Sequence, residues 1–270
     1  MKSILMKFPS LFLALLALAL PAAGAEGVLR LATTTSTENS GLLRVLVPRF
    51  EAASGLKVRV ISVGTGKAMK LGENGDVDVV LVHSRPDEDN FVAQGFGVNR
   101  QDVMHNDFIV VGPKADPAKV ARMKDVIAAF RRILDAKAVF VSRGDDSGTD
   151  KMEKGYWEVV GRRPEGRQYL AAGQGMGEVL TMADNLSGYT LSDRATYGAY
   201  RARLGLDILV EGDRRLFNPY GVIAVNPARY KDVNYRGATQ FIEWITGSEG
   251  RKSIADFRIN GEQLFFPTPR

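Results

Sequence analysis

The sequence lacks cysteine, and this absence excludes two kinds of structure. Disulfide frameworks and thiolate metal sites both require cysteine, and no cysteine is available at a processing site to carry a lipid. Histidine is almost as scarce, since only His83 and His105 are present. Two imidazoles provide few ligands for a metal ion and few candidates for a catalytic base, and we predict no metal site and no cofactor. We interpret His83, which follows an apolar segment, as a structural residue at the edge of a cleft rather than as a ligand.

Long apolar runs and clusters of one charge are also scarce. Beyond residue 25, no segment is long and apolar enough to cross a membrane. Lysine and arginine are interspersed with aspartate and glutamate. The formal net charge is +5, and removing Lys2 and Lys7 with the N-terminal segment leaves +3. This pattern does not support nucleic-acid binding, although a mildly positive field attracts small anions.

Two motifs of well-known enzyme classes are absent or incomplete. Gly-x-Ser-x-Gly does not occur, and Ser147 has no partner histidine that the sequence identifies. The segment Gly64-Thr65-Gly66-Lys67 superficially resembles a phosphate-binding loop, but Ile61 and Ala68 occupy positions where that motif needs glycine and a hydroxyl. We interpret it as a small-residue turn that offers backbone N–H groups to an anion. A secreted serine hydrolase using Ser147 or Ser36 remains an alternative, and it would need a general base within hydrogen-bonding reach.

The first 25 residues have the pattern of a secretory signal peptide. Lys2 and Lys7 give a charged start, residues 11–20 form a short apolar run, and residues 23–25 are small. This pattern predicts export to the periplasm with cleavage after Ala25, and an uncleaved anchor is the alternative. About 245 residues then remain, enough for one large domain or for two lobes with separate cores.

Expected strands and helices alternate along the rest of the chain, which predicts an α/β fold with ligands at the carboxyl ends of the strands. Two such sets predict two lobes, with crossings near residues 107–112 and 214–222. Lobe one would hold residues 26–108 and 218–270, and lobe two residues 109–217. A single open sheet is the alternative. Strands are expected at 28–32, 57–63, 77–82, 108–112, 138–142, 188–191, 207–210 and 216–225, and helices at 41–53, 67–71, 120–134, after 147, and at 177–183, 193–203, 235–245 and 248–257.

The segment from Ser142 to Thr149 has the chemistry of an oxyanion cradle. Arg143 supplies a planar, permanently charged fork, and Ser147, Gly148 and Thr149 stand where a helix should begin. The first N–H groups of a helix have no partner within the helix and point toward an anion. Asp145 and Asp146 have two interpretations. They could accept the proton that a phosphate retains, or they could cap the turn and hold Arg143, and we favour the second.

A second hydroxyl cluster, Thr33-Thr34-Thr35-Ser36-Thr37, follows the first expected strand. Thr35 and Ser36 fall in the turn before the next expected helix, whose N-cap we assign to Ser40 or Asn39. Two hydroxyl clusters far apart in the sequence suggest two lobes that close on one small anion.

Seven segments carry a resemblance to a known family: 32–37, 63–66, 82–85, 106–108, 142–149, 184–185 and 191–194. Taken together, they resemble the Tup-type family, the periplasmic tungstate-binding components of ABC transporters. The resemblance spans nearly the whole chain after residue 25. It implies a type II-like periplasmic binding fold, with mixed sheets flanked by helices and two crossings between lobes. It also implies binding of tungstate and often molybdate, delivery to a membrane permease, and no enzymatic activity.

Carried onto this chain, the resemblance places the anion among three turns, with Arg143 as the only full charge. A phosphate, sulfate or molybdate receptor of the same architecture is the main alternative, and a monomer is expected. The chain departs from the family pattern at Asp150, where a basic or neutral residue is typical. The implied ligand-binding residues are Thr34, Thr35, Ser36, Gly64, Thr65, Gly66, Arg143, Ser147, Gly148 and Thr149.

Overall fold

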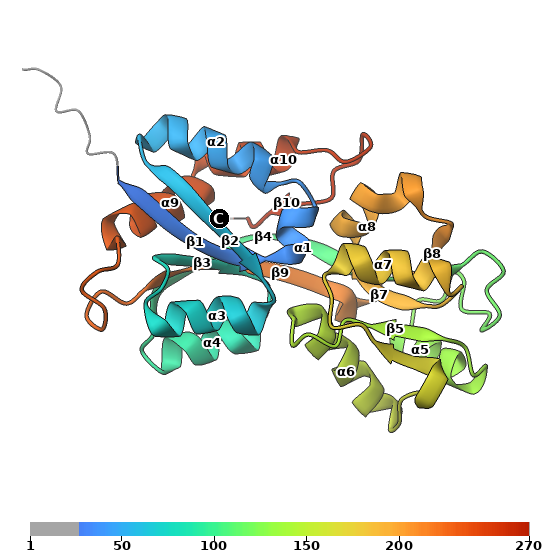
Figure 1. The fold of residues 1–270 in the computed structure, drawn as a ribbon. Coiled ribbons are helices and arrows are strands. Elements are labelled where there is room, and N and C mark those ends of the chain that lie inside the picture. The colour runs from blue at the N-terminus through green and yellow to red at the C-terminus, as the bar shows by residue number, and fades with distance from the viewer. Residues whose placement is uncertain (1–26, 270) are drawn as a thin grey trace, which may run out of the picture.

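The computed structural model describes residues 27–269, and it shows two α/β halves side by side (Figure 1). The strands are β1 Val28–Thr34, β2 Lys57–Val63, β3 Val79–Val82, β4 Gly97–Pro113, β5 Phe140–Ser142, β6 Tyr169–Ala171, β7 Thr190–Asp193, β8 Leu206–Val210, β9 Phe217–Val225 and β10 Phe266–Pro267. The helices are α1 Thr35–Asn39, α2 Leu43–Ser54, α3 Thr65–Asn74, α4 Arg85–Ala93, α5 Val126–Asp135, α6 Gly148–Val160, α7 Met176–Asn185, α8 Arg194–Tyr200, α9 Tyr235–Thr246 and α10 Ser248–Asp256. Short 3-10 turns lie at Gly166–Gln168, Arg201–Arg203 and Arg214–Leu216.

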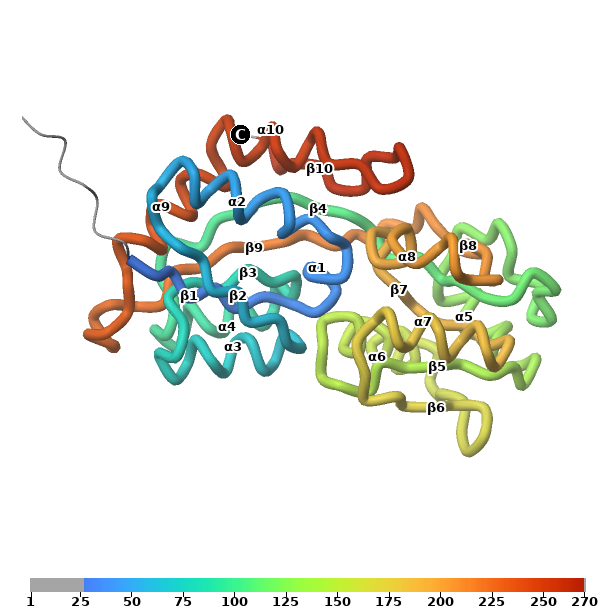
Figure 2. Tube along the Cα trace, turned by 45° about the horizontal axis from the view of Figure 1, so that its top comes forward, coloured from blue at the N-terminus to red at the C-terminus, as the bar shows by residue number. Residues whose placement is uncertain are grey.

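The sheets are mixed rather than purely parallel. Strand β1 pairs in parallel with β2 and β3, whereas β3 and β9 and then β9 and β4 are antiparallel. The partners of β4 change along its length. Through Asp107 it pairs with β9, and from Phe108 onward it pairs with β7 and β8. Figure 2 shows β4 and β9 running together from one half toward the other, so these two strands form the connection between the halves.

Each half has its own hydrophobic core on both faces of its sheet. Successive residues of a strand point to opposite faces. Accordingly, Phe108 and Val110 pack with α5 and α6, while Ile109 and Val111 pack with α7. In the other half, Leu31 and Ala32 divide in the same way between two clusters. The predicted α/β fold with mixed sheets, flanking helices and two connections is thus confirmed.

Several predicted boundaries were wrong. The threonine segment is not a simple turn, because Thr35–Asn39 forms the short helix α1, and the next helix begins at Leu43 without a side-chain cap from Ser40 or Asn39. The helix predicted from residue 120 begins only at Val126, since Asp125 caps it by accepting from the Ala128 N–H. Helix α4, strand β6 and the first half of β4 were not predicted.

Candidate functional site

Three helix starts meet at the junction of the halves, and each follows a strand end. Strand β1 leads into α1, β2 into α3, and β5 into α6 through the loop 143–147. Thr34 caps α1, because its hydroxyl accepts from the Thr37 N–H at 3.2 Å. Ser147 caps α6 in the same way, accepting from the Asp150 N–H at 3.2 Å. The backbone N–H groups of the first turn that no cap or side chain uses have no partner within the helix and are available to an anion.

Arg143 is buried, with 2% of its surface exposed. Its Nη2 donates to Asp145 Oδ2 at 2.5 Å and to Thr35 Oγ1 at 3.3 Å, so it joins the loop of one half to α1 of the other. Its Nε, although buried, has no hydrogen-bond partner among residues 27–269. A buried N–H without a partner is costly, so this donor needs an acceptor that the described residues do not supply.

Asp145 of the loop and Asp150 of α6 bind the loop backbone, whereas the side chain of Asp146 is largely exposed and lies 3.8 Å from Lys151. Asp145 accepts from Arg143 through one oxygen and from the Ser147 N–H at 3.2 Å through the other. Asp150 is fully buried, accepts from the N–H groups of Gly144 at 2.9 Å and Asp146 at 3.2 Å, and pairs with Lys154 at 2.6 Å. Asp150 therefore holds the loop in shape, and Lys154 compensates its charge.

The glycine turn at residues 64–66 packs directly on this loop. The Thr65 hydroxyl accepts from the Gly148 N–H at 3.1 Å, which joins α3 to the start of α6. A Cβ atom on Gly148 would lie 3.2 Å from the His83 backbone oxygen. Glycine is thus needed here for close approach of two backbones. Next to it, Thr149 Oγ1 is buried and also lacks a partner within the described range.

His83 lies behind the hydroxyls and is buried, with 5% of its surface exposed. Its Nε2 is 3.1 Å from Ser36 Oγ and 3.2 Å from Thr34 Oγ1, and its ring stacks on Tyr220 at 4.7 Å. Burial lowers the pKa of His83 to about 4. The hydrogen bond that Asn218 Oδ1 accepts from the ring opposes this lowering, and the charge of Arg143 adds to it. The imidazole is therefore neutral at ordinary pH, as expected for a structural histidine.

The structure thus brings the ten residues predicted for the ligand into one cluster. They come from the end of β1 and α1, from the start of α3 with Gly64 before it, and from the loop before α6 with the first residues of α6. Together they offer one cation, several hydroxyls and backbone N–H groups. Such a donor set suits a small oxyanion. Sequence reasoning missed Asn218 and Asn106 behind His83, and Thr196, whose hydroxyl donates to the Ser36 carbonyl at 3.2 Å. Among the described residues, no group of three His, Asp or Glu side chains converges as metal ligands.

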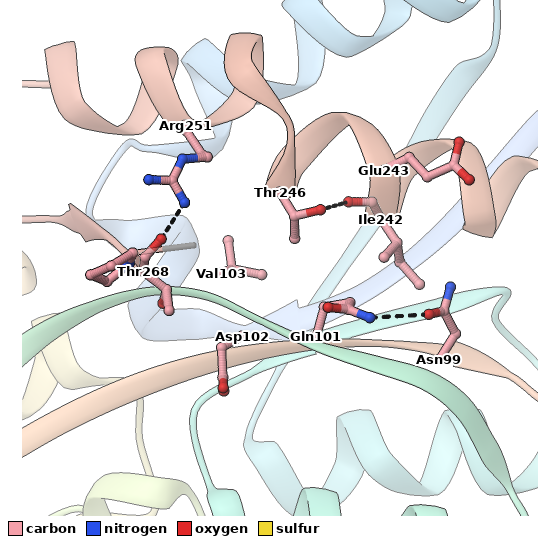
Figure 3. A pocket seen from close by; sticks show the side chains of 10 residues that line it. Asn99, Gln101, Asp102, Val103, Ile242, Glu243, Thr246, Arg251 and Thr268 are labelled. Carbon is pink, nitrogen blue, oxygen red and sulfur yellow. Dashed lines mark hydrogen bonds between the residues drawn. The ribbon is translucent and has the colours of Figure 1, made fainter.

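A separate cavity of about 470 Å³ lies between β4 and the C-terminal helices (Figure 3). Its lining includes Gln101, Glu243 and Arg251, and Arg251 donates to the Thr268 carbonyl. None of the ten candidate residues lines this cavity, so it is distinct from the cluster at the junction. Within residues 27–269 no helix has the length and apolarity needed to cross a bilayer.

Two α/β halves joined by two strands, with a donor-lined junction, define a two-lobe binding protein. The sequence profile of the PBP superfamily domain matches residues 21–249. The tungstate-binding protein TupA of Peptoclostridium acidaminophilum is 49% identical over 247 residues, which cover 90% of this chain and 86% of that protein.

Solved structures agree with this relationship. The tungstate ABC transporter structure from Geobacter sulfurreducens is 53% identical with a TM-score of 0.79, over 86% of this chain and all of that one. The tungstate-binding protein TupA from Desulfovibrio alaskensis G20 is 46% identical with a TM-score of 0.77, over 90% of this chain and all of that one. This chain belongs to the TupA family within the PBP superfamily, as the resemblance predicted.

Proposed function

We propose that this protein captures tungstate in the periplasm and delivers it to the permease of an ABC transporter. One observation carries the proposal. At the junction of the halves, the Nε of buried Arg143 and the hydroxyl of buried Thr149 have no acceptor among the residues that the structure describes. A bound oxyanion would supply acceptors to both. The names of the homologues support tungstate as that anion.

The proposed ligand-binding residues are the ten of the cluster. They divide between two proposed lobes, residues 26–108 with 218–270 and residues 109–217. The open form would present two half-sites, and closure would bring both donor sets around the anion, so that binding selects the closed state. Each half-site comes from the same chain, which supports action as a monomer. The proposed signal peptide, cleaved after Ala25, lies outside the described residues.

The hydrogen bonds of Asp145 support its interpretation as a structural carboxylate of the loop rather than as the acceptor for a phosphate proton. Phosphate retains a proton near neutral pH and needs an acceptor for it. Both carboxylate oxygens of Asp145 already accept hydrogen bonds, from Arg143 and from the Ser147 N–H. Tungstate, molybdate and sulfate carry no such proton. Molybdate matches tungstate in charge and nearly in size, so it is the expected competitor.

A panel of oxyanions tests the proposal. Purified residues 26–270 would be heated with tungstate, molybdate, sulfate or phosphate. A ligand at about 1,000 times its dissociation constant should stabilise the fold by roughly 4 kcal/mol. We expect the largest shift for tungstate, a similar shift for molybdate and little or none for phosphate. Stabilisation by phosphate alone, or by none of the four, would contradict the proposal.

The hydrolase alternative meets one of its requirements, since His83 Nε2 is within reach of Ser36 Oγ. Both side chains are buried, however, and the pKa of about 4 that burial gives His83 makes it a weak base at neutral pH. We therefore infer that the protein is not an enzyme. Turnover of an activated ester, lost in Ser36→Ala, would reverse this inference.

A further inference from the structure

The C-terminal segment of the chain folds back along β4 toward the junction of the halves. Strand β10 pairs antiparallel with β4 at Phe266, and the neighbouring Phe265 is completely buried in the core of that half. Just before β10, two backbone hydrogen bonds join Ile259 and Glu262 in a short hairpin. In Figure 1 this segment, coloured red, extends from α10 toward α8. The hairpin is therefore anchored on the half that holds α9 and α10.

The tip of the hairpin contacts a helix of the other half. Asn260 and Gly261 form the turn with φ angles of 52° and 83°, the left-handed pair that a type I′ hairpin requires. Asn260 Nδ2 donates to the Gly198 carbonyl of α8 at 2.9 Å. The carbonyls of the last turn of a helix have no partner within the helix, so the asparagine supplies one. Within the described part of the chain, no other hydrogen bond joins residues 259–262 to residues 109–217.

Glycine at position 198 lets the hairpin approach α8 closely. A Cβ atom on Gly198 would lie 2.8 Å from Leu264 Cδ1 and 3.4 Å from Ile259 Cγ2. Beside this contact the packing is open, because a cavity of about 550 Å³ lies between the C-terminal segment and the connection of the halves. Phe217 and Arg194 line its far side. The hairpin and α8 can therefore separate without disrupting a continuous core.

Helix α8 connects this contact to the candidate site. In its first turn, the Thr196 hydroxyl donates to the carbonyl of Ser36, one of the ten candidate residues, at 3.2 Å. Ala195 packs in the core of one half and Tyr197 in a core cluster of the other. A short helix of lobe two thus contacts lobe one at both of its ends, once beside the anion and once at the hairpin.

The hairpin and α8 are attached on opposite sides of the point where β4 changes partners. Strand β10 pairs with β4 at Met104 and His105, whereas β7, which leads into α8, pairs with β4 from Phe108 onward. Bending of β4 between these pairings would change the distance between Asn260 and Gly198. Hydrogen bonds weaken steeply beyond about 3.2 Å, so a small movement of α8 away from lobe one would break the contact.

We propose that the hairpin 259–262 is a clasp that holds the two lobes in the closed form. Asn260 binds the last turn of α8, and α8 in turn holds the Thr196 hydroxyl on Ser36 beside the anion. The clasp stabilises the closed form without touching the ligand, so it slows release of the anion and leaves its capture unchanged. This inference rests on the proposed function and adds to it a device that sets the residence time of the anion.

Tungstate dissociation from two variants of the turn tests the clasp. Asn260→Gly tolerates the positive φ angle and removes the donor, whereas Asn260→Asp keeps the shape and places an acceptor against the Gly198 carbonyl. We expect tungstate to dissociate about two- to tenfold faster from Asn260→Gly, and at least as fast from Asn260→Asp. Association rates should stay within about twofold of wild type. Unchanged dissociation from both variants would overturn the proposal.

Asn226→Ala is the matched control, because it removes a similar hydrogen bond within one lobe. Asn226 Nδ2 donates to the Gly95 carbonyl at 2.8 Å, and both residues belong to lobe one. We expect this variant to lose thermal stability and to release tungstate at the rate of wild type. If Asn226→Ala released tungstate as fast as Asn260→Gly, a general loss of stability would explain the effect and the clasp would be rejected.

A measurement without ligand separates the clasp from the proposed function. The chain has no cysteine, so Lys70→Cys and Arg162→Cys introduce one spin label on each lobe, at two largely exposed positions. We expect Asn260→Gly to shift the distances between the labels to larger values in the ligand-free protein. Such a shift in a protein that binds no tungstate would contradict the proposed function and support the clasp. An unchanged distribution of distances would overturn the clasp.

Discussion

At the scale of single residues, the candidate site depends on one buried cation whose hydrogen bonds are only partly satisfied by the described residues. Arg143 faces Asp145, and its Nε is left for a ligand. We predict that Arg143→Gln weakens tungstate binding by about 2 to 5 kcal/mol, the range expected when one member of a buried charged pair is truncated. Titration calorimetry measures the change. Arg162→Gln, on an exposed residue that pairs with Asp135 at 3.5 Å, is the control and should bind normally. Unchanged affinity in Arg143→Gln would remove Arg143 from the site.

The burial of His83 also predicts how stability depends on pH. Burial lowers its pKa from 6.5 to about 4, so the unfolded chain takes up this proton at a higher pH than the folded protein does. Stability should therefore fall as the pH decreases from about 6.5 to about 4, by roughly 3 kcal/mol from this group.

Urea unfolding at pH 7 and pH 4 measures this effect in the wild type and in His83→Gln. The difference between the two proteins isolates His83 from the other groups that titrate. We expect the wild type to lose more stability than the variant over this interval. Parallel losses would show that His83 is not held neutral in the folded protein.

Residues close together in the sequence could be predicted, and residues joined by strand pairing could not. Arg143 and Ser147 lie in one loop, and Thr149 follows at the start of α6. The glycines, hydroxyls and charge of this short segment are typical of a helix start. Asn106 and Asn218 are 112 positions apart and meet only because β4 and β9 pair them in register. Local chemistry in the sequence contains no signal for that pairing.

At the scale of elements, the start of α6 must approach the backbone after β3 closely. A Cβ at position 148 would lie 3.2 Å from the His83 oxygen and 3.5 Å from Thr65 Oγ1. We predict that Gly148→Ala pushes the start of α6 away from the His83 backbone, and with it from α3, by a few tenths of an ångström. This displacement should weaken tungstate binding about tenfold or more, since small displacements at a preorganised site are costly.

Gly155, two turns further along α6, provides the matched control. Its added Cβ would meet nothing within 4 Å, so Gly155→Ala should leave affinity unchanged and raise stability by up to about 1 kcal/mol. Calorimetry and thermal unfolding of both variants make the comparison. Equal affinities for the two variants would show that the contact between α6 and α3 does not shape the site.

The elements that sequence reasoning missed have identifiable causes. The sequence of residues 97–107 is largely polar, since it includes Asn99, Arg100 and Asp102. This segment is nevertheless a strand, because β4 forms backbone hydrogen bonds with β9 there. Helix α4 did have a signal, since Pro86 at its first turn is followed by Asp87 and Glu88. Residues 120–125 were assigned to a helix on apolar spacing, but a positive φ angle at Arg122 interrupts it and the helix begins only at Val126.

At the scale of the whole molecule, an ion pair joins the two halves beside the site. Lys151 of α6 contacts Asp87 of α4 at 2.8 Å, and both side chains are partly exposed. We predict that Lys151→Ala weakens tungstate binding by at most about 1 kcal/mol, through a faster dissociation rate, and that this difference shrinks at high salt.

Stopped-flow dissociation at low and high salt measures this contribution. Lys252→Ala is the control, because its partner Asp256 lies on the same helix, α10, and does not join the halves. A change in the tungstate dissociation rate larger than tenfold would mean that the Lys151–Asp87 pair holds the closed form by itself. An identical change in the control variant would assign the effect to net charge alone.

The continuity of strand β4 determines how the two halves unfold. Val103 and Met104 belong to the core of one half, and Phe108 and Val110 to the core of the other, on one continuous strand. If either core loosens, β4 loses packing contacts that hold it in place, and the other core depends on the same strand. Heat should therefore melt both halves cooperatively, in a single calorimetric peak, although the polypeptide folds around two separate centres.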